Sequence, residues 1–433
     1  MTAADHAFTF DRGIATLAWP EYDVSLTFDR FHEDRRSHDV AAEMSCFTGS
    51  NGSRAMLHRA RLNLGSTRAR TDAAKYLAGR DDSVDWAGLL EQCAWQVLDA
   101  FRRGRDPVLL RDVVVDETAP RVVIAPLLAA DDPVILFGDG GSAKSMLGLA
   151  LAMSVESGTA YAGLPVSQSL KTAYLDFEWQ ASPHRRRMQA LCGDNELPPV
   201  VYVPCGAEGP LSAQVERLQR IIHERSIKYV ILDSVALACA GPPEEAGVAL
   251  DFFQALTRLN VGACLLAHIN RGGDEDRPFG STFWHNSARM TWFLKASQES
   301  GSPRLDLALT NKKSNDGPKA ASFALHFEFE PTRTTITTTD LASIPELAGA
   351  LSIKDRIRAL LKSQPLTVAG LADRLEADAH TVRRTVVRGE GTVFVRIPGP
   401  EPTQWGLLER GTTDRTNGGQ PTGQQGDTRQ RCA

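Results

Sequence analysis

The residues best suited to chemistry lie in one short stretch, Gly138-Asp139-Gly140-Gly141-Ser142-Ala143-Lys144-Ser145, between a strand pattern and a helix pattern. Small residues allow backbone N–H groups to turn inward onto phosphate oxygens, and the N-terminus of the following helix adds partial positive charge. Lys144 would then reach the β- and γ-phosphates of a nucleotide, and the Ser145 hydroxyl would ligate Mg²⁺. The stretch therefore predicts a nucleotide-binding loop, with an ordinary glycine-rich turn as the alternative.

Ala143 departs from the usual pattern of such loops, in which a second glycine stands directly before the lysine. Its methyl group is compatible with the loop if the backbone there stays at negative φ. We therefore expect Ala143 at negative φ in an intact loop.

Two carboxylates at the ends of other strand patterns could complete a site for phosphoryl transfer. Asp233 ends an apolar run, at the sheet edge where α/β proteins place their ligands, and could hold Mg²⁺. Glu178 ends the pattern over residues 171–178 and could polarise the attacking water as a general base. Asp176 is the alternative base, but it lies inside the strand pattern and should point elsewhere, so we favour Glu178.

Later polar and basic residues could sense or stabilise the transferred phosphate. His268 ends a further strand pattern and could report the γ-phosphate to the loop 270–281, unless it is a satisfied core histidine. One of four basic residues could reach the nucleotide of a neighbouring subunit, although each could equally be a surface charge. These four are Arg271, Arg289, Lys312 and Lys313.

Alternating strand and helix patterns from about residue 131 would position these groups, and such alternation predicts a parallel sheet. Its strand patterns cover residues 133–137, 171–178, 200–203, 228–234 and 263–268. Four more strand patterns follow in close succession, so we expect them to pair antiparallel at a sheet edge. They cover residues 290–295, 304–310, 322–329 and 332–338.

Residues 1–120 combine strand patterns with helix patterns at 71–79 and 86–103, and so predict a small α+β module. Between residues 51 and 80 this module carries seven basic side chains against one acid. Such a run can contact DNA phosphates or can be a solvated face, and both interpretations remain open.

Residues 351–410 show three helix patterns followed by two short strand patterns, which is the layout of a winged helix-turn-helix. The third helix carries His380, Arg383, Arg384 and Arg388, as a recognition helix would. A small interaction module without DNA contact is the alternative. Residues 411–433 have almost no apolar content and predict a disordered tail.

Composition limits the partners and the compartment. A formal net charge of −5 gives no global attraction to DNA, so any contact must come from local patches. The seven cysteines form no C-x-x-C pair, which is typical of reduced thiols in a cytoplasmic protein. The most apolar helix pattern, 146–155, is shorter than the roughly 18 residues that a membrane span needs. We therefore expect a cytoplasmic protein with no membrane partner.

Together the motifs resemble the RecA-fold ATPases of the RepA/DnaB hexameric-helicase type, found in replication modules of plasmids, phages and integrated elements. The resemblance covers about residues 120–335 and rests on the phosphate loop and on motifs that arrive in the family's order. These are Tyr174-Leu175-Asp176-Phe177-Glu178, Val230-Ile231-Leu232-Asp233-Ser234, Ala267-His268-Ile269-Asn270, Phe279-Gly280-Ser281-Thr282, Ser287-Ala288-Arg289 and Lys313-Ser314-Asn315.

The resemblance implies ATP and Mg²⁺ as cofactors and a homo-oligomeric ring, a hexamer by preference, with each ATP between subunits. It implies Lys144 and Ser145 as nucleotide and Mg²⁺ ligands, Asp233 as the metal-binding acid and Glu178 as base. It also implies His268 as phosphate sensor, and Lys313 or, next, Arg289 as the residue acting in trans.

The expected fold is α/β, a RecA-like core with a parallel sheet and an antiparallel extension, flanked by the two smaller modules. We expect an accessory module at 1–120, an ATPase core at 121–340, a winged-helix-like domain at 350–410 and the tail at 411–433.

The leading functional hypothesis is a DNA motor or replication helicase, with loops 241–247 and 270–281 touching single-stranded DNA. The second is an ATP-switched regulator or initiator that recognises duplex DNA through its winged helix. It is favoured by the scarcity of base-stacking aromatics in the two central loops, where Phe279 is the one candidate. A filament-forming recombination mediator is a third.

Overall fold

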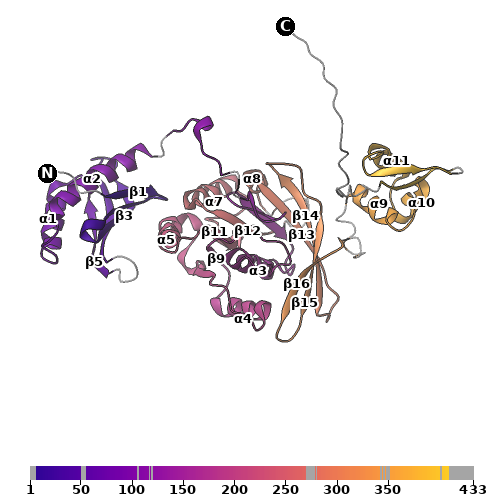
Figure 1. The fold of residues 1–433 in the computed structure, drawn as a ribbon, viewed down its shortest axis with the longest axis horizontal. Coiled ribbons are helices and arrows are strands. Elements are labelled where there is room, and N and C mark those ends of the chain that lie inside the picture. The colour runs from indigo at the N-terminus through magenta and orange to yellow at the C-terminus, as the bar shows by residue number, and fades with distance from the viewer. Residues whose placement is uncertain are drawn as a thin grey trace, which may run out of the picture. The chain divides into compact units, whose positions relative to one another are not determined.

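The computed structural model describes residues 6–49, 55–104, 107–116, 118, 120–269, 278, 280–341, 344, 347, 352–399 and 402–408. The chain forms two compact units, Met1–Ala350 and Leu351–Ala433. The first unit contains an N-terminal antiparallel sheet and a large mixed sheet (Figure 1).

The N-terminal module is a five-stranded antiparallel meander in the order β1-β2-β3-β4-β5, with two helices. Its elements are β1 (Ala7–Asp11), β2 (Ile14–Trp19), β3 (Val24–Glu33), β4 (Val40–Thr48), β5 (Ala55–Asn63), α1 (Thr67–Ala78) and α2 (Trp86–Arg103). Alternate residues of the strands and the apolar face of α2 form one core, which includes Trp19, Phe28 and Trp86. The module is therefore α+β, as the sequence predicts.

Two basic residues of the run between residues 51 and 80 make polar contacts within this module. The Arg59 side chain donates to Ser45 Oγ at 2.9 Å and lies 3.5 Å from a Glu43 carboxylate oxygen. Arg70 donates to both carboxylate oxygens of Glu91, at 2.8 and 3.0 Å. These contacts neutralise part of the run, and its contact with DNA stays a prediction.

The large sheet has nine strands in the order β10-β9-β11-β12-β8-β13-β14-β15-β16. Its strands are β8 (Pro133–Gly138), β9 (Thr172–Asp176), β10 (Val201–Pro204), β11 (Tyr229–Asp233), β12 (Gly262–His268), β13 (Met290–Ser297), β14 (Arg304–Ser314), β15 (Phe323–Phe329) and β16 (Thr334–Thr339). The parallel part runs from β10 to β13, and the antiparallel part from β13 to β16. The antiparallel edge is thus confirmed for the last three strands.

The expectation for β13 is wrong on one side, because this strand pairs parallel with β8 as well as antiparallel with β14. Its middle residues are buried on both faces, which fits a strand inside a sheet rather than at its edge. Close spacing along the chain cannot reveal this pairing, because β8 lies more than a hundred residues earlier.

Helices cover both faces of the sheet, as Figure 1 shows. Helices α3 (Lys144–Ser157) and α4 (Ala181–Cys192) pack on one face, and α5 (Leu211–Glu224) and α7 (Ala246–Leu259) pack on the other. Gly148 lets α3 approach the sheet closely, since a Cβ there would lie 2.7 Å from Leu266 Cδ1. Shorter elements complete this unit: η1 (Pro20–Tyr22), η2 (Leu110–Asp112), β6 (Val122–Ile124), β7 (Leu128–Ala129), η3 (Gly206–Glu208), α6 (Val235–Ala238) and α8 (Thr282–Ser287).

The second unit has its own small core, made by three helices and a three-stranded sheet. Its elements are α9 (Ile353–Leu361), β17 (Leu366–Thr367), α10 (Val368–Leu375), α11 (Ala379–Arg388), β18 (Phe394–Ile397) and β19 (Gln404–Leu407). Ser352, Thr367 and Asp378 accept hydrogen bonds from the first turns of the three helices. The predicted helices and hairpin are confirmed, and the winged-helix assignment stays a prediction.

Within the described part of the chain, no helix is both long and apolar enough to cross a membrane. The six cysteines in that part are all free thiols. The predicted tail 411–433, most of the loop 270–281 with Phe279, and Arg271 lie outside the described residues.

Candidate active site

The carboxyl ends of four parallel strands bring the predicted residues to one edge of the sheet. Register places Gly138 of β8 beside His268 of β12, and Asp233 of β11 beside Asp176 of β9. The helix that follows β8 begins at Lys144, so its N-terminus opens onto the same edge. This is where open α/β sheets bind their ligands.

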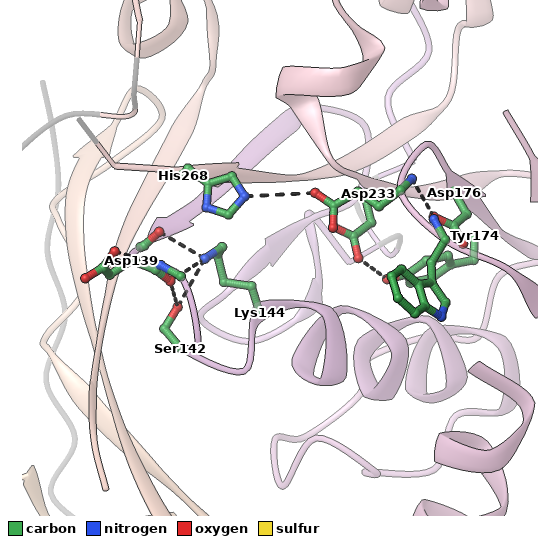
Figure 2. A network of polar contacts seen from close by, with 11 residues as sticks. Asp139, Ser142, Lys144, Tyr174, Asp176, Asp233 and His268 are labelled. Carbon is green, nitrogen blue, oxygen red and sulfur yellow. Dashed lines mark hydrogen bonds and ion pairs between the residues drawn. The ribbon is translucent and has the colours of Figure 1, made fainter. Parts of the chain in front are cut away.

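The phosphate loop encloses the Lys144 side chain, which is only 8% exposed. Lys144 Nζ donates to the carbonyl oxygens of Gly138 at 2.9 Å and Asp139 at 2.6 Å, and to Ser142 Oγ at 3.2 Å (Figure 2). Burial lowers the pKa of Lys144, against the opposing charges of Asp233, Asp139 and Glu178. A bound phosphate would offset this burial, because it would replace carbonyl dipoles with a full negative charge.

Ala143 corrects one expectation from the sequence, since its backbone lies at φ +55° and ψ +21°, in the left-handed region. The loop needs this conformation to turn the chain into α3, and Gly141 two residues earlier also has a positive φ, of +81°. A left-handed alanine costs about 1–2 kcal/mol because its Cβ approaches the backbone carbonyl. The loop therefore carries strain at the position where related loops have glycine. Ala143 also has no side chain that could cap α3, which leaves the first N–H groups of the helix available to an anion.

A buried carboxylate and a hydroxyl form the candidate metal corner. Asp233 is 4% exposed and accepts a hydrogen bond of 2.7 Å from the Tyr174 hydroxyl (Figure 2). Burial raises the pKa of Asp233, while hydrogen bonds from Tyr174 and Ser145 act in the opposite direction. An oxygen-rich pair with a desolvated negative charge suits Mg²⁺, and Ser145 with Asp233 would hold it, directly or through water.

Glu178 and His268 face each other beside the loop. Their closest carboxylate and imidazole atoms are 3.9 Å apart, and the side chains are 34% and 45% exposed. The interaction with His268 is the main reason that the pKa of Glu178 lies below its usual value. The exposure of His268 rules out the alternative of a core histidine. A solvent-accessible, ionised carboxylate next to the phosphate loop can accept a proton from water.

Asp176 is the last residue of β9 and has a different environment from Glu178, which lies in the loop that follows. Its carboxylate is buried and accepts hydrogen bonds from the backbone N–H groups of Glu178 and Trp179, from His184 and from Tyr202. Burial alone would raise the pKa of Asp176, but these four donors outweigh it and hold the value at about 2. Its lone pairs are occupied by protein donors, so it is poorly placed to activate water.

Three side chains of the site carry no signal in the sequence: Tyr174, His184 and Tyr202. Tyr174 belongs to the motif that ends in Glu178, but its distance in sequence from Asp233 does not show that its hydroxyl donates to that carboxylate. His184 and Tyr202 come from α4 and β10, and only the packing of these elements brings them to Asp176. The sequence does contain a local signal for the Asp176–Glu178 contact. Aspartate side chains often accept a hydrogen bond from the backbone N–H two residues further along the chain, as Asp176 does from Glu178.

Lys313 and Arg289 lie towards the opposite end of the sheet from the phosphate loop. Arg289 pairs with the residues that begin β8: its backbone N–H donates to Pro133 O, and its side chain lies 3.7 Å from Asp132. The length of β8 separates this end from Gly138 by about 17 Å. Arg289 therefore cannot contact the phosphate bound by its own loop. Lys313 lies nearer along the strands: its partner Thr291 on β13 is level with Ile135 of β8, three residues or about 10 Å from Gly138.

Lys313 Nζ also has partners within its own chain. It donates to the carbonyl oxygens of His285, Asn286 and Ala288 at 2.9, 2.8 and 2.6 Å, which caps the C-terminus of α8. Burial and the charge of Arg289 lower the pKa of Lys313. A role in trans would require Lys313 to leave these carbonyls.

Comparison with known families agrees with the geometry of the loop. Residues 101–273 match the model of the AAA_25 family, which is described as an AAA domain. This part of the chain is a P-loop ATPase domain. Among solved structures, a KaiC-like protein from the hyperthermophilic archaeon Pyrococcus horikoshii OT3 is similar, with 14% sequence identity and a TM-score of 0.37. That similarity covers 50% of this chain and 93% of the other. No curated protein matches the chain.

The ATPase domain has a RecA-like arrangement, in which β12 lies between the phosphate-loop strand β8 and the Asp233 strand β11. P-loop ATPases generally bind ATP with Mg²⁺. The match covers residues 101–273. It therefore excludes the strands of the N-terminal meander, strands β13 to β16 of the large sheet, and the C-terminal unit.

Proposed function

We propose that the protein is an ATP-hydrolysing, ring-forming DNA motor or replication helicase of the RepA/DnaB type. The proposal rests on one observation: the residues suited to bind and hydrolyse the nucleotide lie at one end of the large sheet, and the basic residues suited to act in trans lie towards the other. The phosphate loop, Glu178 and His268 lie at one end, and Lys313 and Arg289 lie towards the other. A basic residue held away from the phosphate loop of its own chain would assist hydrolysis on a neighbouring subunit.

In this proposal Lys144 and Ser145 bind the β- and γ-phosphates and Mg²⁺, and Asp233 completes the metal corner. Glu178 accepts the proton of the attacking water, whose line of approach is set by the bound γ-phosphate. His268 contacts both Glu178 and the γ-phosphate region, and so senses whether ATP or ADP is bound. Lys313, or else Arg289, stabilises the charge that develops on the phosphate of the next subunit, most simply in a hexamer.

DNA is the proposed polymer partner. Single-stranded DNA would pass the central loops 241–247 and 270–281. Residues 241–245 precede α7 as a loop, and residues 246–247 already form its first turn. The exposed face of α11 would meet duplex DNA, since its side chains include His380, Arg383 and Arg384.

The second candidate is an ATP-switched regulator or initiator that binds duplex DNA without unwinding it. The separate C-terminal unit favours it, because three capped helices and a hairpin have the layout of a winged helix. In that case slow hydrolysis would reset an assembly rather than move DNA.

The deciding measurement is ATP hydrolysis with and without single-stranded DNA, together with the mass of the protein in solution with ATP and Mg²⁺. Strong stimulation by single strands in a ring-sized oligomer, abolished in Lys144→Ala, would support the motor and lead to an unwinding assay. Slow hydrolysis from a monomer or dimer, unchanged by single strands, would refute the motor. A specific duplex footprint lost in Arg383→Ala/Arg384→Ala would then establish the regulator.

A further inference from the structure

The loop that carries Glu178 is fixed by a hydrogen-bond cluster centred on Asp176. Asp176 Oδ1 accepts from the backbone N–H of Glu178 at 2.9 Å and from that of Trp179 at 3.0 Å. Asp176 Oδ2 accepts from His184 Nε2 at 3.0 Å and from the Tyr202 hydroxyl at 2.9 Å. One carboxylate group therefore joins the Glu178 backbone to two side chains from other elements.

His184 and Tyr202 hold Asp176 from two separate elements. His184 lies in α4, is 4% exposed, and its ring packs 4.8 Å from the Tyr174 ring and 5.9 Å from the Tyr202 ring. Tyr202 lies in the edge strand β10 and is half-buried. Its hydroxyl is also 3.4 Å from the Trp179 carbonyl oxygen, so it contacts both Asp176 and the loop that follows it.

This cluster controls the orientation of the Asp176 carboxylate. Rotation about its side chain would break the bonds at Oδ1 and Oδ2 together, and the buried carboxylate has no bulk water to replace them. Removing a donor at Oδ2 relaxes that restraint and lets the bonds at Oδ1 lengthen. The Glu178 side chain is 34% exposed, so its own packing restrains it little and its position depends on this backbone.

We propose that His184 and Tyr202 are positioning residues that act through Asp176 to hold Glu178 where it activates water. The inference rests on the proposed function, in which Glu178 is the general base for ATP hydrolysis. The hydrogen-bond partners of their side chains are Asp176 and the Trp179 backbone, not the phosphate loop. They should therefore affect the rate of the chemical step and leave ATP binding unchanged.

Tyr202→Phe tests the inference, because it removes one hydroxyl and keeps the ring of a half-buried side chain. Tyr229→Phe is the matched control: Tyr229 is buried in the same sheet, and its hydroxyl has no hydrogen-bond partner among the described residues. In the full-length protein we expect Tyr202→Phe to lower kcat about tenfold and to keep KM for ATP within about twofold. Tyr229→Phe should keep both values.

Amide hydrogen exchange gives a readout that needs no turnover. The N–H groups of Glu178 and Trp179 are donors to Asp176, so we expect their exchange to speed up about tenfold in Tyr202→Phe and to stay unchanged in Tyr229→Phe. A double-mutant cycle then separates positioning from general stability. In a Glu178→Gln background, Tyr202→Phe should cause no further loss of the residual rate, because the group that it positions is already absent.

The outcomes distinguish the inference from the function on which it rests. Wild-type turnover with an unaffected kcat in Tyr202→Phe would overturn the inference alone. A tenfold loss that persists in the Glu178→Gln background would also overturn it, because the effect would then not pass through Glu178. A wild-type protein that binds but does not hydrolyse ATP would refute the proposed function, and the inference with it.

Discussion

Replacing Ala143 by glycine tests whether the phosphate loop is strained as the structure indicates. One contribution to the free energy of unfolding favours the glycine variant, and two favour the wild type. Glycine removes a left-handed penalty of about 1–2 kcal/mol at φ +55°. It destabilises the folded protein by about 0.5–1 kcal/mol, because the unfolded chain gains backbone entropy. It also loses a partly buried methyl group, worth at most about 0.8 kcal/mol.

These contributions nearly cancel, so we expect Ala143→Gly to lie within about 0.5 kcal/mol of the wild-type stability. Ala190→Gly is the control, because Ala190 is a half-buried alanine within helix α4 of the same domain. That substitution has the entropy and methyl losses without any relief of strain, and should cost about 1 kcal/mol or more.

Thermal unfolding without nucleotide measures the difference directly. For a domain of this size, 1 kcal/mol corresponds to a shift in Tm of about 2–4 °C, so Ala190→Gly should unfold at least that much earlier than wild type. Ala143→Gly should shift Tm by less than about 2 °C. Equal losses in both variants would refute the reasoning, because they would place Ala143 at negative φ in solution.

Three other predictions concern catalysis. Glu178→Gln should retain ATP binding and lose turnover by about 10²–10⁴-fold, and near-normal turnover would exclude Glu178 as base. Tyr174→Phe should raise the Mg²⁺ concentration needed for half-maximal turnover several-fold, because Asp233 loses the hydroxyl that donates to it at 2.7 Å. A Mg²⁺ titration at saturating ATP would measure this, and an unchanged titration curve would contradict it. His268→Ala should move the acidic limb of the pH–rate profile to higher pH. Glu178 must be ionised to act as base, and its pKa rises towards the usual value once the interaction with His268 is gone, so an unmoved limb would argue against the pair.

The architecture of the ATPase domain could be predicted because its signals are local. Apolar strands that end in polar residues, separated by helices, determine a parallel sheet whose ligand edge holds the phosphate loop, Asp233 and His268. The parallel pairing of β13 with β8 could not be predicted, because strand order depends on contacts between residues far apart in sequence.

The same division applies to single side chains. Strand alternation by itself does not separate Asp176 from Glu178, since residues two apart in an extended chain face the same side; they differ because β9 ends at Asp176 and Glu178 lies in the loop that follows. Only the tertiary structure decides that α4 and β10 supply His184 and Tyr202 to Asp176, that Tyr174 meets Asp233, and that Ala143 is left-handed. The sequence by itself thus determined which groups stand at the ends of which strands. Packing determined the partners of those groups, because hydrogen bonds and backbone strain depend on distances that sequence spacing does not contain.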